Sequence, residues 1–461
     1  NGSNPNMDII TNFAGITQSE TSVAWFGSKA IVGFNDSGSF LSTLVTPLPP
    51  PGAGNLSFNG WSRSTNANVG TPAWTDMGIL PPITQPGATF TDCFGDPVCR
   101  TTRLTDFYMC SLGYDSVPGP NFSTILMFRS TDGGATFPVV TNAAAANAGT
   151  NFLDKPWMDV KPGASTAADT IHVVYTNFAV GGTSIDYVRS TNGAATWSVP
   201  VAIAAVADPS FLQFGQVVVT PGTDKVYVAW EEFAAGGVRT LRLRKSTDGG
   251  ITFGPPIAIG TVAPSGDGIA LDWLQGTFRA GMEFSGFAVN PANGHLYVSY
   301  HAGTVTSPDI FAADDLYRYA DVFFRKSTDE GATWSAPVRV NNDPVANIVD
   351  QFQPGMAVTK KGRIFIIFYD RRNSGGQNYN MQLFAARSIN GGATWTNKSR
   401  SGKGVFAPTV AAQNDFFVNP VYMGDYNNPS ADKSGADGVK TIAAWGDNTL
   451  GNPDIRVEKF P

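Results

Sequence analysis

Charged residues are scarce in this chain, at 15% of 461 positions, compared with roughly 25% in an average soluble domain. The 31 Lys and Arg residues against 37 Asp and Glu residues give a net charge of −6. Because no run of basic residues occurs, a nucleic-acid partner or an anionic membrane surface is disfavoured. No stretch approaches the ~18–20 consecutive apolar residues of a membrane span. With only three histidines and three cysteines, a zinc site is not expected either.

The cysteines allow several arrangements. Cys99 and Cys110 enclose CRTTRLTDFYMC, a segment typical of a hairpin whose turn centres near Leu104. This symmetry places the two thiols opposite each other on paired strands and predicts a disulfide between them. A Cys93–Cys99 bond is the rival pairing, and three reduced core cysteines are the remaining alternative. The chain starts at Asn1 without an initiator Met, so we expect a secreted, extracellular protein whose signal peptide has been removed.

What the chain does contain is one polar phrase, repeated. It reads KSTDGGITF at 245–253, with near-copies beginning at 129, 189, 326 and 387 and a stretched copy beginning at Arg63. Its serines recur at intervals of about 60 residues, which is too long for a helical repeat and suits a four-stranded propeller blade. These serines are Ser64, Ser130, Ser190, Ser246, Ser327 and Ser388.

Each unit contains paired β-rich runs before the phrase, such as GQVVVTP and KVYVAWEEF, separated by a short turn. A third strand leads into the phrase and a short fourth strand follows it. Counting these pairs predicts an all-β, seven-bladed β-propeller that forms a single domain over residues 1–461, with six blades as the alternative. The expected blades span approximately 18–80, 88–142, 152–205, 208–262, 283–342, 350–403 and 415–461, the last joined by 7–14. The strand at 7–14 would close the ring and remove an open sheet edge.

The phrase itself is explained by turn formation. Its Asp or Asn can accept hydrogen bonds from backbone N–H groups within the turn, and its glycines supply positive φ. The Thr and the Trp or Phe then begin the fourth strand. We therefore expect the five phrases to be structural supports between the third and fourth strands.

The phrase resembles the Asp-box, or BNR repeat, of the sialidase-like propellers. The whole chain is similar to a broad group of secreted "sialidase family" proteins of mostly unassigned function. The resemblance covers nearly the full length, through QSETSVAW at 18–25, GDP at 95–97, DKPW at 154–157, FYDRR at 368–372, GDY at 424–426 and AWGDN at 444–448. It implies the fold but not one activity, because such repeats occur in sialidases, other glycosidases, lectins and receptors.

Strand order predicts where a site would lie. The phrases share one face with the turns between first and second strands, and the remaining loops share the opposite face. That opposite face collects the unusual polar residues, including Glu20, Asp96 and Glu283 at strand entrances. Loops on a rigid scaffold are where binding functions usually lie. The candidate catalytic residues are Asp154, Glu231, His301, Asp370 and Tyr426. The candidate substrate-binding residues are Lys155, Trp157, Asp272, Arg279, Arg371, Arg372 and Asp425.

Each candidate also has a structural interpretation. A carboxylate at a strand entrance can cap a loop, Trp157 can pack beneath a neighbouring blade, and Asp370 with Arg371 can form an internal salt bridge. Hard oxygen ligands are abundant enough for a structural Ca²⁺, although no spacing specifies one and no cofactor is certain.

A sialidase should present an arginine triad for a carboxylate, an Asp acid and a Tyr–Glu nucleophile pair. The first inner strand here reads ETSVAWFG, without arginine, whereas Asp154 could act as the acid and Tyr426 could pair with Glu231 or Glu283. We expect a monomer that acts on or binds a glycan or polysaccharide, as an exo-acting glycoside hydrolase if it is an enzyme. The alternatives are a lectin-like or structural, adhesive surface protein, and a polysaccharide lyase with His301 as a proton-transfer group.

Overall fold

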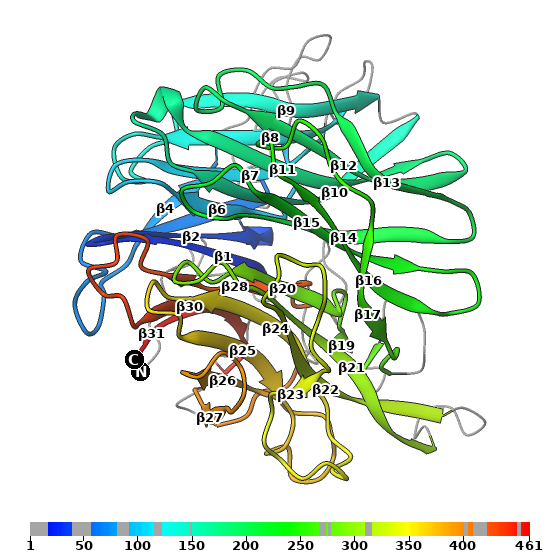
Figure 1. Cartoon of the computed structure of the whole chain (residues 1–461). Coiled ribbons are helices and arrows are strands. Elements are labelled where there is room, and N and C mark those ends of the chain that lie inside the picture. The colour runs from blue at the N-terminus through cyan, green and yellow to red at the C-terminus, as the bar shows by residue number, and fades with distance from the viewer. Residues whose placement is uncertain are drawn as a thin grey trace.

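The computed structural model describes residues 17–38, 57–80, 92–114, 122–147, 150–266, 273–274, 278–308, 316–400, 404–408, 422–449 and 453–461. Within these residues the structure is almost entirely β, and seven blade sheets are arranged radially around a common centre (Figure 1). The predicted seven-bladed β-propeller is confirmed. The strand expected at 7–14 lies outside the described residues. No helix in the described part of the chain is long and apolar enough to cross a membrane.

The first four blades follow the chain in order. Blade 1 contains β1 (Gln18–Phe26), β2 (Lys29–Asp36), β3 (Asn59–Ser64) and β4 (Thr75–Ile79). Blade 2 contains β5 (Asp92–Cys93), β6 (Val98–Thr101), β7 (Phe107–Tyr114), β8 (Phe122–Ser130) and β9 (Val139–Asn147). Blade 3 contains β10 (Asn151–Lys161), β11 (Thr170–Ala179), β12 (Gly182–Ser190) and β13 (Val201–Ala207), with the 3-10 helix η1 (Thr166–Ala168) between β10 and β11. Blade 4 contains β14 (Phe211–Val219), β15 (Val226–Phe233), β16 (Arg239–Ser246) and β17 (Ile257–Val262).

The last three blades complete the ring. Blade 5 contains β20 (Phe284–Val289), β21 (Leu296–Pro308), β22 (Leu316–Ser327) and β23 (Val338–Arg339), preceded by the small pair β18 (Trp273–Leu274) and β19 (Phe278–Arg279). Blade 6 contains β24 (Gln351–Val358), β25 (Ile364–Asp370), β26 (Gln382–Ser388) and β27 (Thr396–Ser399). Blade 7 contains β29 (Ser430–Ala431), β30 (Thr441–Asp447) and β31 (Asp454–Phe460). The short strand β28 (Asn427–Asn428) lies between blades 7 and 1.

The inner strand predicted for the last blade is interrupted. Pro429 separates β28 from β29, because proline has no N–H to donate to a sheet. As a result β29 pairs with β30 in blade 7, whereas β28 pairs in parallel with β1 of blade 1. The first and last blades are therefore joined at the innermost part of the ring.

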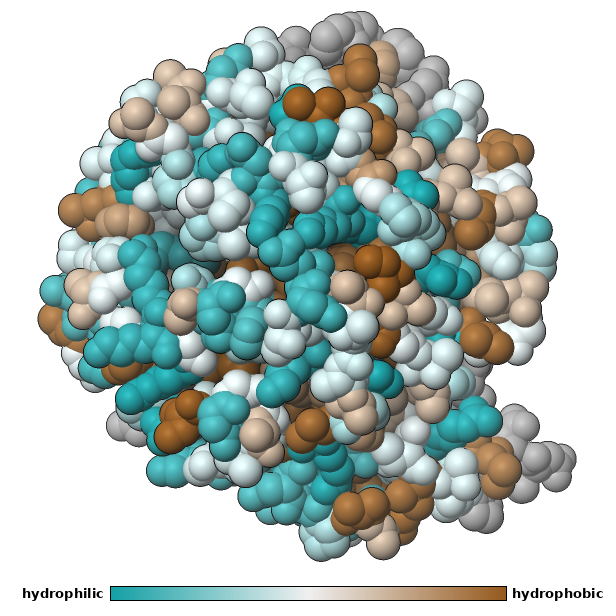
Figure 2. Space-filling model, in the orientation of Figure 1, coloured by the Kyte–Doolittle hydropathy of each residue, from teal (hydrophilic) through white to brown (hydrophobic). Residues whose placement is uncertain are grey.

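Apolar side chains packed between neighbouring sheets form the core. The second strands are covered on both sides, so they read as continuous apolar runs rather than alternating ones. In β15, for example, seven of eight residues are buried, and Trp230 is among the largest fully buried side chains. On the face in view, hydrophilic side chains gather near the middle and hydrophobic residues are scattered (Figure 2).

The repeated phrases form the turns after the third strands, as predicted. In the phrase at 245–253, the Ser246 hydroxyl donates to Asp248 Oδ1 (2.7 Å) and accepts from the Gly250 N–H (2.8 Å). Asp248 Oδ1 in turn accepts from the Thr252 N–H at 2.9 Å. The residue before the serine reaches the next blade's phrase in four cases. Arg63 donates to the Gly133 carbonyl, Arg129 to the Gly193 carbonyl and Arg189 to the Gly249 carbonyl, and Lys245 pairs with the carboxylate of Glu330. The phrases thus close their own turns and link neighbouring blades.

Replacing Ser246 with alanine should lower the free energy of unfolding by about 1–3 kcal/mol, because the Gly250 N–H would lose its partner in a buried position. Urea unfolding followed by tryptophan fluorescence measures the change. Ser165→Ala is the matched control, since Ser165 is exposed and its side chain makes no capping hydrogen bond. An equal loss in both variants would contradict a specific role for the phrase.

The predicted disulfide between Cys99 and Cys110 is wrong. All three cysteines are free and buried. In the β6–β7 pairing, Cys110 is opposite Val98 and Cys99 is opposite Met109, so the two cysteines are one residue out of register. Because successive side chains on a strand point to opposite faces, Cys99 enters the core between blades 1 and 2, and Cys110 enters the core between blades 2 and 3.

Candidate functional site

The innermost strands begin with a shared backbone feature that aims polar side chains at the ring axis. Lys155 in β10 has φ +48°, Glu20 in β1 has φ +51° and Gln353 in β24 has φ +54°. Each lies in a register irregularity between its strand and the next strand of the blade. Asp96, just before β6, has φ +56°. Positive φ is unfavourable for such residues, and bulges of this kind re-aim side chains at functional sites.

Lys155 is the centre of the resulting network. Its ammonium lies 3.0 Å from Glu20 Oε1, 3.1 Å from Asp96 Oδ2 and 2.6 Å from Asp425 Oδ2. These carboxylates come from the inner ends of blades 1, 2 and 7. All four side chains are buried, with at most 8% exposed. Burial disfavours the charged form of Lys155, but the three carboxylates outweigh it and raise its pKa well above the ordinary value.

The pKa values of Glu20 and Asp96 are shifted in opposite directions. Glu20 accepts hydrogen bonds from the Asn35 side chain (2.9 Å), the Asp425 N–H (3.1 Å) and the Tyr422 hydroxyl. Burial favours its neutral form, but the Lys155 charge and the hydrogen bonds with Asp96 and Tyr422 prevail, so the pKa of Glu20 is lowered. Burial and the adjacent charge of Glu20 instead raise the pKa of Asp96 well above its ordinary value. Environments that separate two carboxyl pKa values in this way create an acid and a base.

Arg279 and Tyr422 extend the network outward. Arg279 Nη1 lies 3.1 Å from Asp425 Oδ1, and the guanidinium lies 5.0 Å from the centroid of the Tyr422 ring. The Arg279 side chain is 25% exposed, whereas the Lys155 side chain is 8% exposed. Gly281 (φ +52°) permits this approach, because a Cβ there would come within 1.9 Å of Asp425 Oδ1. Burial and the charge of Glu20 raise the pKa of Tyr422 well above its ordinary value, so its phenol keeps its proton.

Asp154 borders the network. Its Oδ2 accepts a hydrogen bond from Gln213 Nε2 of blade 4 at 3.1 Å. Burial, together with the charges of Asp425 and Glu20, raises the pKa of Asp154, and Lys155 opposes that shift. The structure thus brings four of the candidate residues, Asp154, Lys155, Asp425 and Arg279, into one electrostatic unit.

Trp157 and Tyr426 support the network from beneath. Their rings pack edge to face with centroids 5.4 Å apart, and both residues are buried. The Tyr426 hydroxyl donates to the Pro97 carbonyl at 3.1 Å, and its ring lies 5.9 Å below the Lys155 ammonium. Because no carboxylate receives the Tyr426 proton in these contacts, the geometry does not favour it as a nucleophile.

A second buried cluster contains Glu231 and His301. Arg239 forms an ion pair with Glu283, and burial together with Arg239 lowers the pKa of His301 to about 4. His301 is fully buried, and neither of its ring nitrogens has a hydrogen-bond partner among the described residues. Glu231 contributes a hydrogen bond that helps to lower the pKa of Glu283. At neutral pH the imidazole is therefore uncharged and enclosed.

Asp370, Arg371 and Arg372 lie in blade 6 and make separate internal contacts. Arg372 pairs with Asp370 at 2.7 Å, and Arg371 pairs with Asp350 at 3.5 Å. Arg371 and Asp370 are fully buried. The expected Asp370–Arg371 salt bridge is replaced by these two pairs, and the contacts stated here do not reach Lys155. Asp272 lies outside the described residues.

Glu20 and Asp96 were recognised in the sequence only as members of the polar face, and Tyr422 was not selected. The sequence does contain a pattern that could have identified Asp96 as a site residue. GDP at 95–97, DKP at 154–156 and FQP at 352–354 align so that Asp96, Lys155 and Gln353 occupy one position, each before proline and each at positive φ. Tyr422 precedes its inner strand without such a pattern.

The described residues do not form a metal site. No group of three or more His, Cys, Asp and Glu side chains in the described ranges could hold a metal ion. The three carboxylates at the ring centre surround the Lys155 ammonium, which takes the place a Ca²⁺ ion would need.

Comparison with solved structures shows likeness in fold. An ulvan lyase of polysaccharide lyase family PL25 matches with a TM-score of 0.52 and 11% identity, covering 96% of this chain and 94% of that one. An α-L-arabinanase of Penicillium chrysogenum complexed with arabinobiose matches with a TM-score of 0.44 and 15% identity, covering 77% and 89%. The Hadza microbial sialidase Hz136 matches with a TM-score of 0.43 and 15% identity, covering 79% and 65%. The sequence matches no protein family model and no curated protein.

Proposed function

We propose that this protein is a secreted, sialidase-like glycan-degrading enzyme whose site is the Lys155 network, on the face opposite the repeated phrases. The observation that supports this most is a Tyr–Glu pair beside a protonated carboxyl group. Tyr422 donates to Glu20, and Glu20 and Asp96 both contact the Lys155 ammonium. Together they supply the proton donor, the nucleophile and the base that glycosidic cleavage by a tyrosine requires.

The proposed reaction uses Asp96 as the acid. Burial and the charge of Glu20 raise its pKa, which favours the protonated carboxyl group, and this group can donate a proton to the glycosidic oxygen as the bond to the leaving sugar breaks. Tyr422 Oη attacks the anomeric carbon while its proton passes to Glu20, which is ionised. In the second step, water attacks the glycosyl–tyrosine, Asp96 takes the proton of the water, and Glu20 returns a proton to Tyr422. The anomeric configuration is retained.

Arg279 favours an acidic glycan as substrate. It is the most exposed cation of the network, and a guanidinium can bind a carboxylate with two parallel hydrogen bonds. An arginine triad is not formed among the described residues of the network, since Arg371 and Arg372 are paired elsewhere. A uronate is therefore as suitable a substrate as a sialic acid.

The second candidate is a polysaccharide lyase. The ulvan lyase shares the fold over 96% of this chain, and one structure of that enzyme carries bound -[GlcA(1-4)Rha3S]-. In such a reaction Arg279 would neutralise the uronate carboxylate, ionised Glu20 would take the proton from the carbon next to that carboxylate, and Tyr422 would protonate the oxygen that leaves as the double bond forms. The product would contain an unsaturated uronate, whereas hydrolysis would leave a saturated sugar.

The test is a screen for sugars released from mixed acidic and neutral glycans by the parent, Tyr422→Phe and Tyr426→Phe. We expect Tyr422→Phe to lower the rate about 10²–10⁴-fold, because the acid–base and nucleophilic roles of the phenol are lost. Tyr426→Phe is the matched control and should lose less than tenfold, since among the described residues its hydroxyl bonds only to the Pro97 carbonyl. Ultraviolet absorbance of the products separates the lyase from the hydrolase.

The parent could turn over no glycan and still bind glycans on an array. This result would contradict the proposal of an enzyme and favour a lectin-like binding protein. A larger loss in Tyr426→Phe than in Tyr422→Phe would instead restore Tyr426 as the nucleophile.

A further inference from the structure

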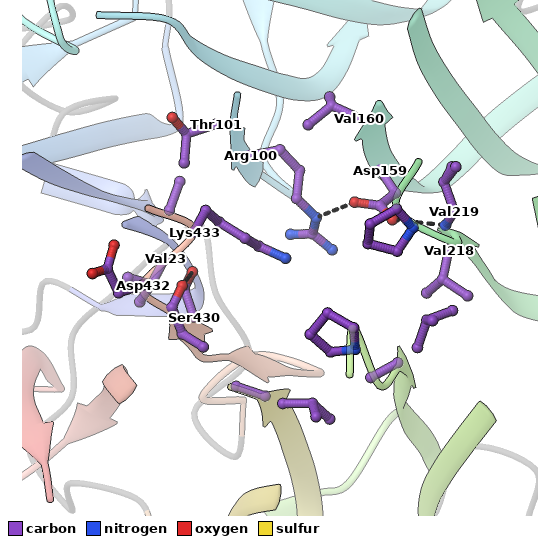
Figure 3. A pocket seen from close by; sticks show the side chains of 18 of the residues that line it. Val23, Arg100, Thr101, Asp159, Val160, Val218, Val219, Ser430, Asp432 and Lys433 are labelled. Carbon is purple, nitrogen blue, oxygen red and sulfur yellow. Dashed lines mark hydrogen bonds and ion pairs between the residues drawn. The ribbon is translucent and has the colours of Figure 1, made fainter. Parts of the chain in front are cut away.

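A cavity of about 410 Å³ lies on the ring axis, near the face that carries the repeated phrases. The C-terminal parts of the innermost strands of all seven blades line it (Figure 3). Asp159, one of its lining residues, follows Lys155 by four positions in β10, which places the two about 13 Å apart along the strand. Lys155 is not among the lining residues. The cavity is therefore separate from the proposed glycan site.

The cavity is positively charged although the chain as a whole is negative. Its lining includes four cationic side chains and two carboxylates, in a protein whose net charge is −6. One carboxylate, Asp432, is engaged by the Gly27 N–H at 2.8 Å and by the Ser434 hydroxyl at 2.7 Å. The cations are Arg100, Lys161, Lys360 and Lys433, of which Lys161 pairs with Asp224 outside the cavity lining.

Two of these cations extend into the middle of the cavity. Figure 3 shows the guanidinium of Arg100 and the ammonium of Lys433 pointing toward the same part of the cavity from two different walls. Arg100 Nε lies 3.6 Å from Asp159 Oδ1, and the other oxygen of Asp159 accepts from the Val219 N–H at 2.8 Å. Arg100 also donates from Nη1 to the Cys99 carbonyl at 2.8 Å. These contacts fix the guanidinium but leave donors directed at the cavity.

Lys433 lacks a matching negative charge. No hydrogen bond or ion pair of its ammonium is formed within the described part of the chain, and its side chain is accessible from the cavity. The enclosing protein lowers the pKa of Lys433, Arg100 and Lys360 lower it further, and Asp159 opposes them. Two cations held close together around one shared carboxylate form an incomplete arrangement that an anion would complete.

We propose that this axial cavity binds a small organic anion whose carboxylate or phosphate group is held between Lys433 and Arg100. The uncharged part of the ligand packs against the apolar wall, which includes Val23, Val218, Val289 and Met356. The cavity volume is within the range of small-molecule sites, which combine apolar walls with a few convergent polar groups. This site is independent of the proposed glycan-degrading function.

Isothermal titration with benzoate tests the proposal, because benzoate combines a carboxylate with an apolar ring. Benzamide has nearly the same shape without the charge, and inorganic phosphate has the charge without the ring. We expect benzoate to bind the parent more tightly than either probe, and added salt to weaken its binding. Lys433→Met should weaken benzoate binding at least about tenfold, because a charge-assisted hydrogen bond is lost.

Lys29→Met is the matched control and should bind benzoate as the parent does. Lys29 lies at the start of β2, contacts the Asp132 carbonyl and does not line the cavity. Lys433→Gln repeats the test with a polar side chain, and circular dichroism verifies that each variant folds. Any of three results would overturn the proposal. The parent could bind benzamide as tightly as benzoate, it could bind neither benzoate nor phosphate, or both Lys433 variants could bind benzoate as tightly as the parent.

Discussion

Replacing Lys155 with methionine is expected to lower the free energy of unfolding by about 3–5 kcal/mol, because the variant leaves buried carboxylates without their shared counter-charge. Glu20 and Asp425 are fully buried, and Asp96 is 8% exposed on its side chain. Methionine preserves most of the volume of the lysine stem, so the loss reports on charge rather than on a cavity. Urea unfolding of the two proteins at pH 7 measures the difference.

The decrease in the free energy of unfolding caused by Lys155→Met should also depend on pH. Without the ammonium, the buried carboxyl groups would have folded-state pKa values above their unfolded values. Such groups add stability below about pH 4 and lose it as the pH rises through the folded pKa. The gap between the variant and the parent should therefore widen between about pH 4 and pH 7.

Lys161→Met is the matched control for Lys155→Met. Lys161 pairs with Asp224 at the surface, where the side chains are 29% and 66% exposed. A surface pair of this kind contributes about 0–1 kcal/mol, so the control should unfold almost as the parent does. Similar losses in the two variants would contradict a central role for Lys155.

Replacing Asp96 with asparagine is expected to lower turnover on the identified glycan about 10²–10⁴-fold, because asparagine cannot donate a proton to the glycosidic oxygen. The amide can still donate a hydrogen bond to Glu20, so the local contacts are largely kept. Turnover of the parent should fall as the pH rises through the pKa of Asp96, and Asp96→Asn should lose this alkaline limb. Rate measurements across pH test both statements.

The stability of Asp96→Asn separates catalysis from folding. The pKa of Asp96 is raised in the folded protein, so the group adds stability below its unfolded pKa of about 4 and loses it as the pH rises through the folded pKa. Asparagine is neutral at every pH, so the variant does not lose this stability as the pH rises. At pH 8 the free energy of unfolding of Asp96→Asn should therefore lie at most about 1 kcal/mol below that of the parent. A variant that loses activity and unfolds at much lower urea would point to a structural role instead.

The blade period could be predicted because turn chemistry is local. Each repeated phrase carries the Ser, the Asp or Asn, and the glycine that close its own turn, so a few adjacent residues are sufficient to locate the end of a third strand. Strand order then assigned each loop to a face, and this placed Asp154, Lys155, Arg279 and Asp425 together. These inferences required no knowledge of which blade touches which.

Partners across the ring could not be predicted in the same way. The sequence paired Tyr426 with Glu231 or Glu283, but the structure pairs Tyr422 with Glu20, which are separated by 402 positions. The choice depends on the bulge that turns Glu20 inward and on Pro429, which ends β28. The cysteine prediction failed for a related reason, because a one-residue difference in register reverses the direction of a side chain.

The position of the Lys155 network has a consequence for the order in which the protein matures. Glu20 and Asp425 meet at the ring centre although 405 residues separate them. A chain emerging from the ribosome acquires its N-terminal parts first. It holds Glu20, Asp96 and Lys155 long before it holds Tyr422 and Asp425. Until the last blade arrives, the lysine has two of its three carboxylates and Glu20 has no phenol to receive a proton from. The proposed active site is therefore completed only at the final step of synthesis. A chain without its last blade lacks Tyr422 and Asp425, two of the residues of that site.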